Sequence, residues 1–112
     1  MKKIFLLLVL IFALFMSCSK LDITKGTPKC VDTKIEAFNN ATVCRDAKVD
    51  EYTFQGGTVY VFDQGTCGAD MTSAVIDSDC NALGNLGGFT GNMTINGENF
   101  SNATYVKTVW NK

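Results

Sequence analysis

An unbroken apolar run, Ile4 to Met16, opens the chain directly after the basic pair Lys2-Lys3. Thirteen residues are too few for a transmembrane helix, which needs roughly 20 residues to cross the hydrocarbon layer. A basic start followed by a short apolar run is typical of a secretory signal peptide. We therefore expect residues 1–17 to be removed on export.

A helical period follows in the segment after the signal. Val31, Ile35 and Phe38 recur at intervals of four and three residues, which places them on one face of a short helix. Thr27-Pro28 fits an N-cap residue followed by proline at the first helical position. We expect Asn39-Asn40 to end this helix.

Two β-rich runs, Val49 to Gln55 and Thr58 to Asp63, flank Gly56-Gly57. Runs of this kind separated by two glycines predict a hairpin with a primed turn. The expected core face of the hairpin consists of two cross-strand pairs: Phe54 with Val59, and Tyr52 with Val61. Tyr60 and Phe62 would then lie on the other face, which must be partly covered or serve as a binding surface.

Weaker patterns follow the hairpin. Ser73 to Asp77 predicts a third strand, residues 81–92 are rich in turn residues, and Met93 to Ile95 predicts a short strand. Asn102 to Trp110 has apolar residues at helical spacing, but its β-branched and aromatic content favours a strand. The sum is a small α+β domain, with one N-terminal helix packed on a short antiparallel sheet.

Five cysteines change this picture. Ser17-Cys18, directly after the apolar run, resembles the site at which a lipoprotein signal is cleaved and its cysteine acylated. Residues 18–28 would then be the lipidated cysteine and a tether, and residues 29–112 the domain. The alternative is ordinary cleavage that leaves Cys18 as a free thiol.

The other four cysteines, Cys30, Cys44, Cys67 and Cys80, suggest disulfides, because a small exported domain has limited core stability. Four cysteines allow three pairings. The local pairing Cys30–Cys44 and Cys67–Cys80 closes the shortest loops, and the crossed pairings remain open. A zinc site is the competing interpretation. It is disfavoured by the absence of histidine and of closely spaced cysteine pairs.

The pattern from Cys30 to Trp110 resembles an uncharacterised domain family of small Bacteroidota lipoproteins. The residues that carry the resemblance form five blocks: Cys30 with Ile35, Glu51 to Phe54 with Val59 to Phe62, Cys67 to Asp70, Val75 to Asp77 with Cys80-Asn81, and Gly87 to Asn92. The resemblance implies an exported, lipid-anchored protein. It implies no activity.

Aspartates provide one candidate site. Asp77, Asp79 and Asn81 have the spacing that opens a calcium loop, but Ala82 and Gly88 stand where that loop needs glycine and glutamate. An irregular calcium site could use four aspartates: Asp63, Asp70, Asp77 and Asp79. In the expected hairpin register Asp50 would also lie opposite Asp63, where like charges repel. The alternative is that these residues shape turns.

Aromatic residues provide the second candidate. Tyr60, Phe62 and Phe89 could form a binding surface, together with Tyr105 and Trp110, because aromatic residues are enriched at binding hot spots. In a small domain, however, aromatic residues mostly fill the core. The Gly-rich segment from Gly84 to Gly91 lacks the spacing of a nucleotide-binding loop, and we expect an irregular loop there.

Composition excludes some partners and chemistries. Loss of residues 1–17 removes Lys2 and Lys3 from ten basic residues and leaves eight against eleven acidic ones, a net charge of −3. Without a basic stripe, nucleic acid is not an expected partner, and without histidine there is no Ser-His or Cys-His pair. We expect no cofactor and no enzymatic activity.

The expected protein is an outer-membrane lipoprotein of the cell envelope, displayed on the periplasmic face or the cell surface. Its expected role is that of a binding or structural module for an envelope protein or glycan. Protein inhibition of an enzyme and calcium-stabilised adhesion are the alternatives.

Overall fold

Residues 21–112 are described by the computed structural model, so the expected signal peptide and Cys18 lie outside the described residues. Helix α2 (Lys29–Ala41) comes first. The strands are β1 (Lys48–Phe54), β2 (Gly57–Asp63), β3 (Thr72–Asp77), β4 (Ala82–Gly87), β5 (Thr94–Ile95), β6 (Glu98–Asn99) and β7 (Thr104–Asn111), and a 3-10 helix, η1 (Phe100–Asn102), precedes β7. The predicted α+β class is confirmed.

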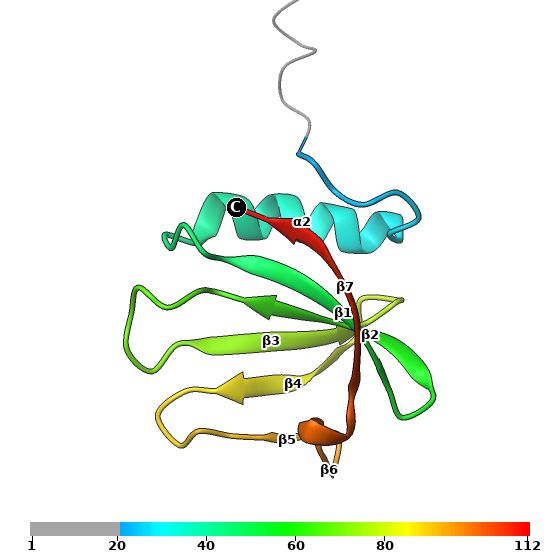
Figure 1. Ribbon diagram of the computed structural model, residues 1–112, viewed down its shortest axis with the longest axis vertical. Helices are drawn as coiled ribbons and strands as arrows, with labels where there is room; N and C mark the ends of the chain where they lie inside the picture. The colour runs from blue at the N-terminus through cyan, green and yellow to red at the C-terminus, as the bar shows by residue number, and fades with distance from the viewer. Residues whose placement is uncertain (1–20) are drawn as a thin grey trace, which may run out of the picture.

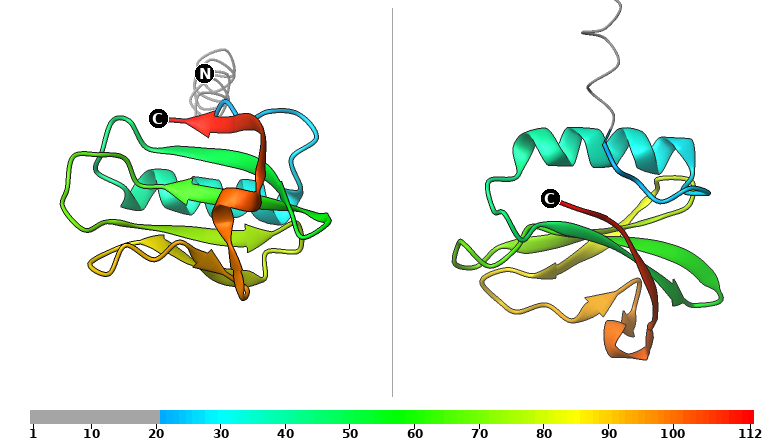
Figure 2. Two further views of the ribbon diagram at one scale, coloured as in Figure 1. Left: turned by 60° about the horizontal axis from the view of Figure 1, so that its bottom comes forward. Right: turned by 45° about the horizontal axis from the view of Figure 1, so that its top comes forward.

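Five strands form the main sheet in the order β4-β3-β2-β1-β7, and each neighbouring pair is antiparallel. Helix α2 crosses one face of this sheet, whereas β5, β6 and η1 lie against the other face (Figures 1 and 2). Because both faces are covered, both faces of the central strand β2 are apolar, and Val59 to Phe62 are all buried.

The helix forms where the apolar period predicted it. Val31 and Ile35 are fully buried, and Phe38 packs beside them. The predicted N-cap is wrong: Pro28 itself occupies the N-cap position, and the Thr27 hydroxyl donates to the Thr24 carbonyl at 2.7 Å. The helix continues to Ala41, because Thr42 is the first residue with an extended backbone.

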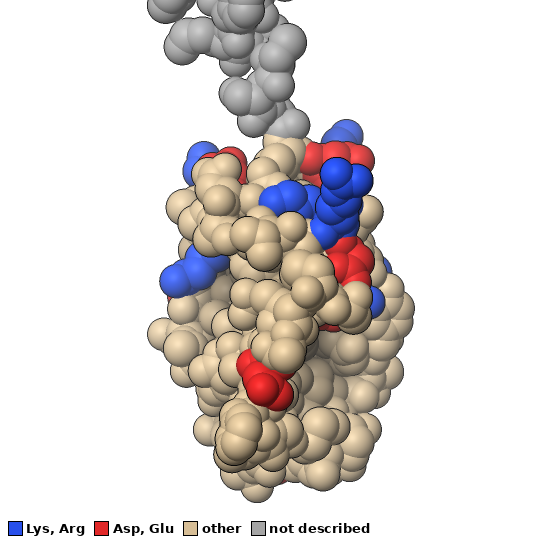
Figure 3. Space-filling view, turned by 90° about the vertical axis from the view of Figure 1, so that its left-hand side faces the viewer, with Lys and Arg blue, Asp and Glu red and all other residues tan. Residues whose placement is uncertain are grey.

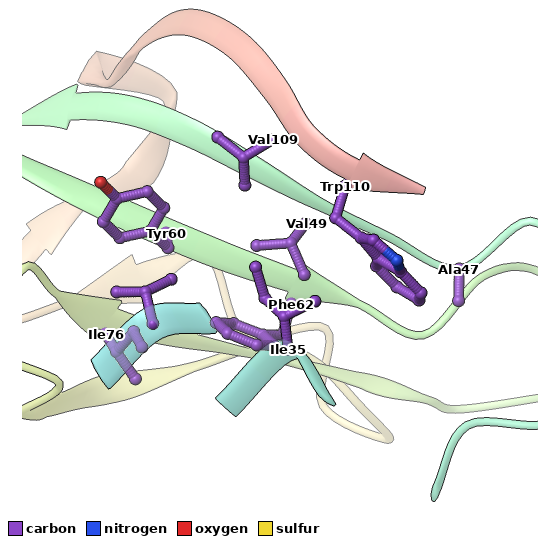
Figure 4. Packing of buried hydrophobic residues seen from close by; sticks show 9 residues of the cluster. Ile35, Ala47, Val49, Tyr60, Phe62, Ile76, Val109 and Trp110 are labelled. Carbon is purple, nitrogen blue, oxygen red and sulfur yellow. The ribbon is translucent and has the colours of Figure 1, made fainter. Parts of the chain in front are cut away.

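The core between helix and sheet explains why Tyr60 and Phe62 are aromatic. Val31 and Ile35 pack against side chains from four strands: Val49, Tyr60, Phe62, Ile76, Val109 and Trp110 (Figure 4). The Phe38 ring meets the rings of Phe62 and Trp110 edge-on, at centroid distances of 5.3 and 5.9 Å. Burial of each such side chain stabilises the fold by roughly 1.5–3 kcal/mol.

The opposite face of the sheet carries a second core. It consists of Phe54, Val59, Val61, Val75, Ile95 and Phe100, with Tyr52 packed against them. Phe100 of η1 contacts the rings of Tyr52 and Phe54 at centroid distances of 5.1 and 5.0 Å. The predicted core face of the hairpin, which holds Tyr52, Phe54, Val59 and Val61, is therefore confirmed.

The predicted hairpin turn is wrong by one residue, and each predicted cross-strand partner is wrong by two residues. The turn residues are Gln55 and Gly56, whose φ values of 51° and 75° are those of a type I′ turn, and Tyr52 pairs with Val59. Gln55 tolerates the left-handed conformation because its side chain exchanges hydrogen bonds with Asn96, at 3.2 and 2.9 Å. A two-residue change of partner leaves every side chain on its predicted face.

This register also removes the predicted opposition of Asp50 and Asp63. Asp63 lies opposite Lys48, and Asp50 lies opposite Val61. Lys48 and Asp63 thus place opposite charges across the two strands.

Later elements depart from the sequence pattern in one place. The third strand and the C-terminal strand are confirmed, but the expected turns of residues 81–92 include the edge strand β4. Gly84, with φ of 150°, lies at an irregularity in its pairing with β3. In β7, Val109 lies in the helix-side core whereas Phe100 and Ala103 pack in the other core, so the apparent helical spacing does not form one face.

The disulfide pairing favoured by loop length is wrong. Cys30 of α2 bonds Cys80, which follows β3, and Cys44 bonds Cys67 in the β2–β3 connection. The Cα atoms of the two pairs are 6.2 and 5.5 Å apart, within the usual range. Each bond joins the helix or its exit to a loop at the end of the sheet, and so fixes the helix on the sheet.

The segment expected to be a tether joins the domain from Leu21 onward. Leu21 and Ile23 pack against the helix-side core. The Thr24 amide donates to the Val109 carbonyl at 2.9 Å.

Candidate functional site

The predicted acidic site divides into separate turns. The Asp77 carboxylate accepts hydrogen bonds from the amides of Asp79 and Asn81, both at 2.9 Å, and from the Asn81 side chain at 3.0 Å. The Asn81 side chain first, and then its backbone amide, lowers the pKa of Asp77 below its ordinary value. These bonds explain the D-x-D-x-N spacing as a turn between β3 and β4.

Of the other candidate aspartates, Asp63 ends strand β2, whereas Asp70 and Asp79 lie in connections. Asp63 accepts a hydrogen bond from the Gly65 amide at 2.8 Å, and Asp70 is exposed with a left-handed φ of 55°. Within residues 21–112, no three Asp, Glu, Cys or His side chains come together in an arrangement that could hold a metal ion. The structure therefore brings Asp63, Asp70, Asp77 and Asp79 into no common site.

The predicted aromatic surface is wrong for three of its five residues. Tyr60 and Phe62 are 3% and 6% exposed beneath α2, and burial, followed by the charge of Glu51, raises the pKa of Tyr60. Trp110 is buried in the same core. Phe89 and Tyr105 remain, 91% and 55% exposed, and Phe89 is the more fully presented of the two.

Phe89 lies on a braced turn, which we call the distal loop (residues 87–92). Gly87 and Asn92 exchange two backbone hydrogen bonds of 2.8 and 3.0 Å, and the Gly91 amide donates to the Gly88 carbonyl at 3.1 Å. The Asn92 side chain donates to the carbonyls of Asn85 and Thr94, at 2.6 and 2.9 Å. The glycines expected to form an irregular loop thus form an ordered one.

The chain on either side of the distal loop is uncharged. Residues 80–97 contain no Lys, Arg, Asp or Glu. On the face that Figure 3 shows, charged side chains gather toward the end where the described chain begins, and the lowest part of that face lacks them. The loop itself lies on the opposite side of the sheet from α2 (Figure 1).

A polar network on β1 and β7 was missed by the sequence analysis. Asp50 is 4% exposed, accepts a hydrogen bond from the Thr108 hydroxyl at 2.6 Å and lies 3.3 Å from the Lys48 ammonium. The Tyr105 hydroxyl lies 3.0 Å from that of Thr108. Hydrogen bonding to Asp50, followed by the charge of that residue, raises the pKa of Lys48. The network satisfies a buried carboxylate, and its only sequence signal is an acidic residue at an inward-facing strand position.

A hollow between helix and sheet, which we call the helix–sheet groove, has a volume of about 520 Å³. One wall is α2 and the other is formed by β2, β3 and the start of β4, with apolar residues predominating on both walls. Its residues are Lys34, Ala37, Phe38, Ala41, Thr42, Phe62, Gln64, Thr72, Ala74, Ile76 and Ala82. No sequence pattern placed these residues together, because the groove joins residues from distant parts of the chain.

The chemistry available to the described residues is limited by the disulfides. Cys30, Cys44, Cys67 and Cys80 are all oxidised, so within residues 21–112 no thiol can act as a nucleophile. Across the same residues, no helix has the length and apolar character needed to span a membrane.

These features define a small, disulfide-linked α+β domain with an exposed aromatic loop and an apolar groove. The family described as Domain of unknown function (DUF6970) matches residues 35–112, and the chain belongs to this family. No curated protein and no solved structure matches the chain.

Proposed function

We propose that this protein is a non-enzymatic binding module of the bacterial cell envelope, anchored by acyl chains on Cys18. The basic and apolar pattern of residues 1–17 and the Ser17-Cys18 sequence support export and lipidation. Several acyl chains on one residue hold a protein firmly on a membrane, since each buried CH₂ contributes about 0.8 kcal/mol. The resemblance to small Bacteroidota lipoproteins favours the outer membrane.

Phe89 is the observation that carries the binding role. A fully presented aromatic side chain is an effective anchor when its loop is already ordered, because binding then costs little conformational entropy. The hydrogen bonds of the distal loop supply that order. The absence of charged residues from the segment 80–97, which carries the loop, favours an apolar pocket on an envelope protein as the partner.

The placement of the loop suits an anchored protein. The described chain begins beside α2, and the distal loop lies across the sheet from that point (Figure 1). A domain held through its N-terminal segment would therefore direct Phe89 away from the anchor.

The test uses intact cells that express the full chain with a photo-crosslinking amino acid at position 89. We expect a discrete crosslinked species in the membrane fraction. The matched control places the same amino acid at Val43, an apolar position that is 79% exposed. Equal crosslinking at both positions, or none at position 89, would contradict the proposed interface.

A Cys18→Ala variant tests the anchor in the same cells. Loss of the acylation site should move the protein from the membrane fraction to the soluble fraction. Retention of the variant in the membrane fraction would contradict anchoring through Cys18.

Inhibition of an enzyme is a second candidate, because a braced loop with one protruding side chain can block an active site. If the crosslinked species is a hydrolase, the wild-type protein should lower its activity and Phe89→Ala should not. Unchanged hydrolase activity would mean that the protein binds the hydrolase but does not inhibit it.

A further inference from the structure

The helix–sheet groove exists because short side chains line it. Ala37 and Ala41 lie on the helix wall, and Ala74 and Ala82 lie on the strand wall. Larger residues at these positions would fill the space between α2 and the strands β3 and β4. The volume of about 520 Å³ lies in the range of small-molecule sites, roughly 300–1,000 Å³.

The polar residues of the groove hydrogen-bond to the protein itself. The Gln64 amide donates to the Thr72 carbonyl at 2.7 Å, and the Thr42 hydroxyl donates to the Gln64 carbonyl at 3.4 Å. With these groups occupied, the groove presents mainly the side chains of Phe38 and the alanines, with the buried Phe62 at its base. Such a lining favours a hydrocarbon chain.

Lys34 is the one ionisable residue that lines the groove. Within residues 21–112 its ammonium has no carboxylate partner, since the ion pair of that region joins Lys48 and Asp50. A second hollow, next to the Cys30–Cys80 disulfide, also meets Lys34 and Ala37. Lys34 therefore stands where the apolar groove opens to solvent, and its charge favours an anionic head group there.

The helix sets the length of the ligand. Lys34, Ala37, Phe38 and Ala41 lie at positions i, i+3, i+4 and i+7, along one face of α2. At a rise of 1.5 Å per residue, the groove runs about 10 Å from Lys34 to Ala41. The part of an acyl chain nearest its carboxylate fits this distance, and the end of a medium-length chain extends beyond Ala41.

We propose that the helix–sheet groove binds an anionic single-chain amphiphile, a fatty acid, with its carboxylate at Lys34 and its acyl chain running over Ala37 toward Ala41. This site is independent of the proposed anchor at Cys18 and of the distal loop. It goes beyond the proposed function, because it assigns a small-molecule ligand to a second surface.

The test measures dodecanoate binding by calorimetry, below the micellar concentration, to purified protein that carries Cys18→Ser so that no acyl chain of its own interferes. We expect binding with one-to-one stoichiometry. Ala74→Leu and Ala41→Leu should each weaken it at least tenfold by filling the groove, with unchanged circular dichroism as the check on folding. No binding, or binding that neither variant weakens, would overturn the proposal.

The head group is tested with Lys34→Gln, which should weaken dodecanoate binding at least tenfold and leave dodecanol binding unchanged. Lys29→Gln, on the same helix but outside the groove, is the matched control and should bind like the wild type. Equal loss for dodecanoate and dodecanol would overturn the carboxylate assignment. Sedimentation that shows a dimer, dissociated by Ala74→Leu, would assign the groove to a second copy and overturn the proposal as a whole.

Discussion

At the scale of single residues, the acidic side chains of this domain act mainly on the backbone. Asp77 accepts three hydrogen bonds across the β3–β4 turn. Asp46 accepts hydrogen bonds from the Thr66 hydroxyl and amide, and these bonds, that of the side chain first, lower its pKa. Asp50, the buried exception, is satisfied by Thr108 and Lys48. Loops and strand ends, rather than a metal, account for the spacing of the aspartates.

Asp77→Asn should lower the melting temperature at neutral pH, because an amide accepts these hydrogen bonds less strongly than a carboxylate. The pKa of Asp77 lies below the ordinary value of 3.8 in the folded protein. The stabilisation from its charge is therefore present above about pH 3.8 and is lost as the pH falls through the lower folded pKa. Thermal unfolding over a pH series should show the two melting temperatures converging in acid.

Asp70→Asn is the control for this series. Asp70 is exposed and has a left-handed φ of 55°, a conformation that asparagine also adopts readily. We expect the melting temperature of Asp70→Asn to equal that of the wild type at every pH. A constant deficit of Asp77→Asn from neutral pH into acid would show that its carboxylate charge does not stabilise the turn.

At the scale of elements, hydrogen bonds join two hairpin turns. Gln55-Gly56 joins β1 to β2 and Asn96-Gly97 joins β5 to β6, and all four residues have positive φ. The Gln55 side chain donates a hydrogen bond to the Asn96 backbone carbonyl, and the Asn96 side chain donates one to the Gln55 side-chain oxygen. Local sequence favoured Gly56-Gly57 as the turn, but this distant contact favours Gln55-Gly56 instead.

Two glycine substitutions distinguish the observed turn from the predicted one. Gly56→Ala should destabilise the protein by about 1–2 kcal/mol, because its φ of 75° is unfavourable for a residue with a Cβ atom. Gly57→Ala should be nearly neutral, since an added Cβ would meet only the Phe54 carbonyl at 3.9 Å. Denaturant unfolding measures both. Equal losses for the two variants would instead support a Gly56-Gly57 turn.

At the scale of the whole molecule, the disulfides fix the single helix on the sheet. They span 50 and 23 residues, and loops of these lengths correspond to about 4 and about 3.5 kcal/mol of stabilisation in the chain-entropy treatment. For a small domain such contributions are comparable to the total free energy of unfolding, about 5–15 kcal/mol. The local pairing would have closed shorter loops and left the helix unattached.

Mass spectrometry without reduction checks the pairing. Cleavage by trypsin and cyanogen bromide separates the four cysteines into peptides 30–34, 35–45, 49–71 and 72–93, according to the positions of Lys, Arg and Met. We expect peptide 30–34 linked to 72–93, and peptide 35–45 linked to 49–71. Links of 30–34 to 35–45 and of 49–71 to 72–93 would instead establish the local pairing.

Unfolding of matched double variants measures how much each disulfide stabilises the protein. Cys30→Ser with Cys80→Ser should lose up to about 4 kcal/mol, and Cys44→Ser with Cys67→Ser up to about 3.5 kcal/mol. Because the first pair closes the longer loop, it should show the larger loss. The reverse order would contradict loop length as the main determinant.

Local pattern by itself determined the elements whose signals lie within a few residues. The spacing of Val31, Ile35 and Phe38 predicted the helix, and the alternation along β1 and β2 predicted which side chains share a face. The β-branched content of residues 104–109 likewise favoured a strand. These predictions held because the helix and strand periods involve only neighbouring residues. Burial of one face also stabilises an element whose apolar residues follow its own period.

Tertiary structure alone decided what depends on residues far apart in the chain. The partner of each cysteine, the position of the hairpin turn and the walls of the helix–sheet groove all follow from how α2 and β5–β6 pack on the main sheet. Burial of Tyr60 and Phe62 follows in the same way, since only the placement of the helix distinguishes a core aromatic from an exposed one. Phe89 stays exposed because its loop extends beyond both cores.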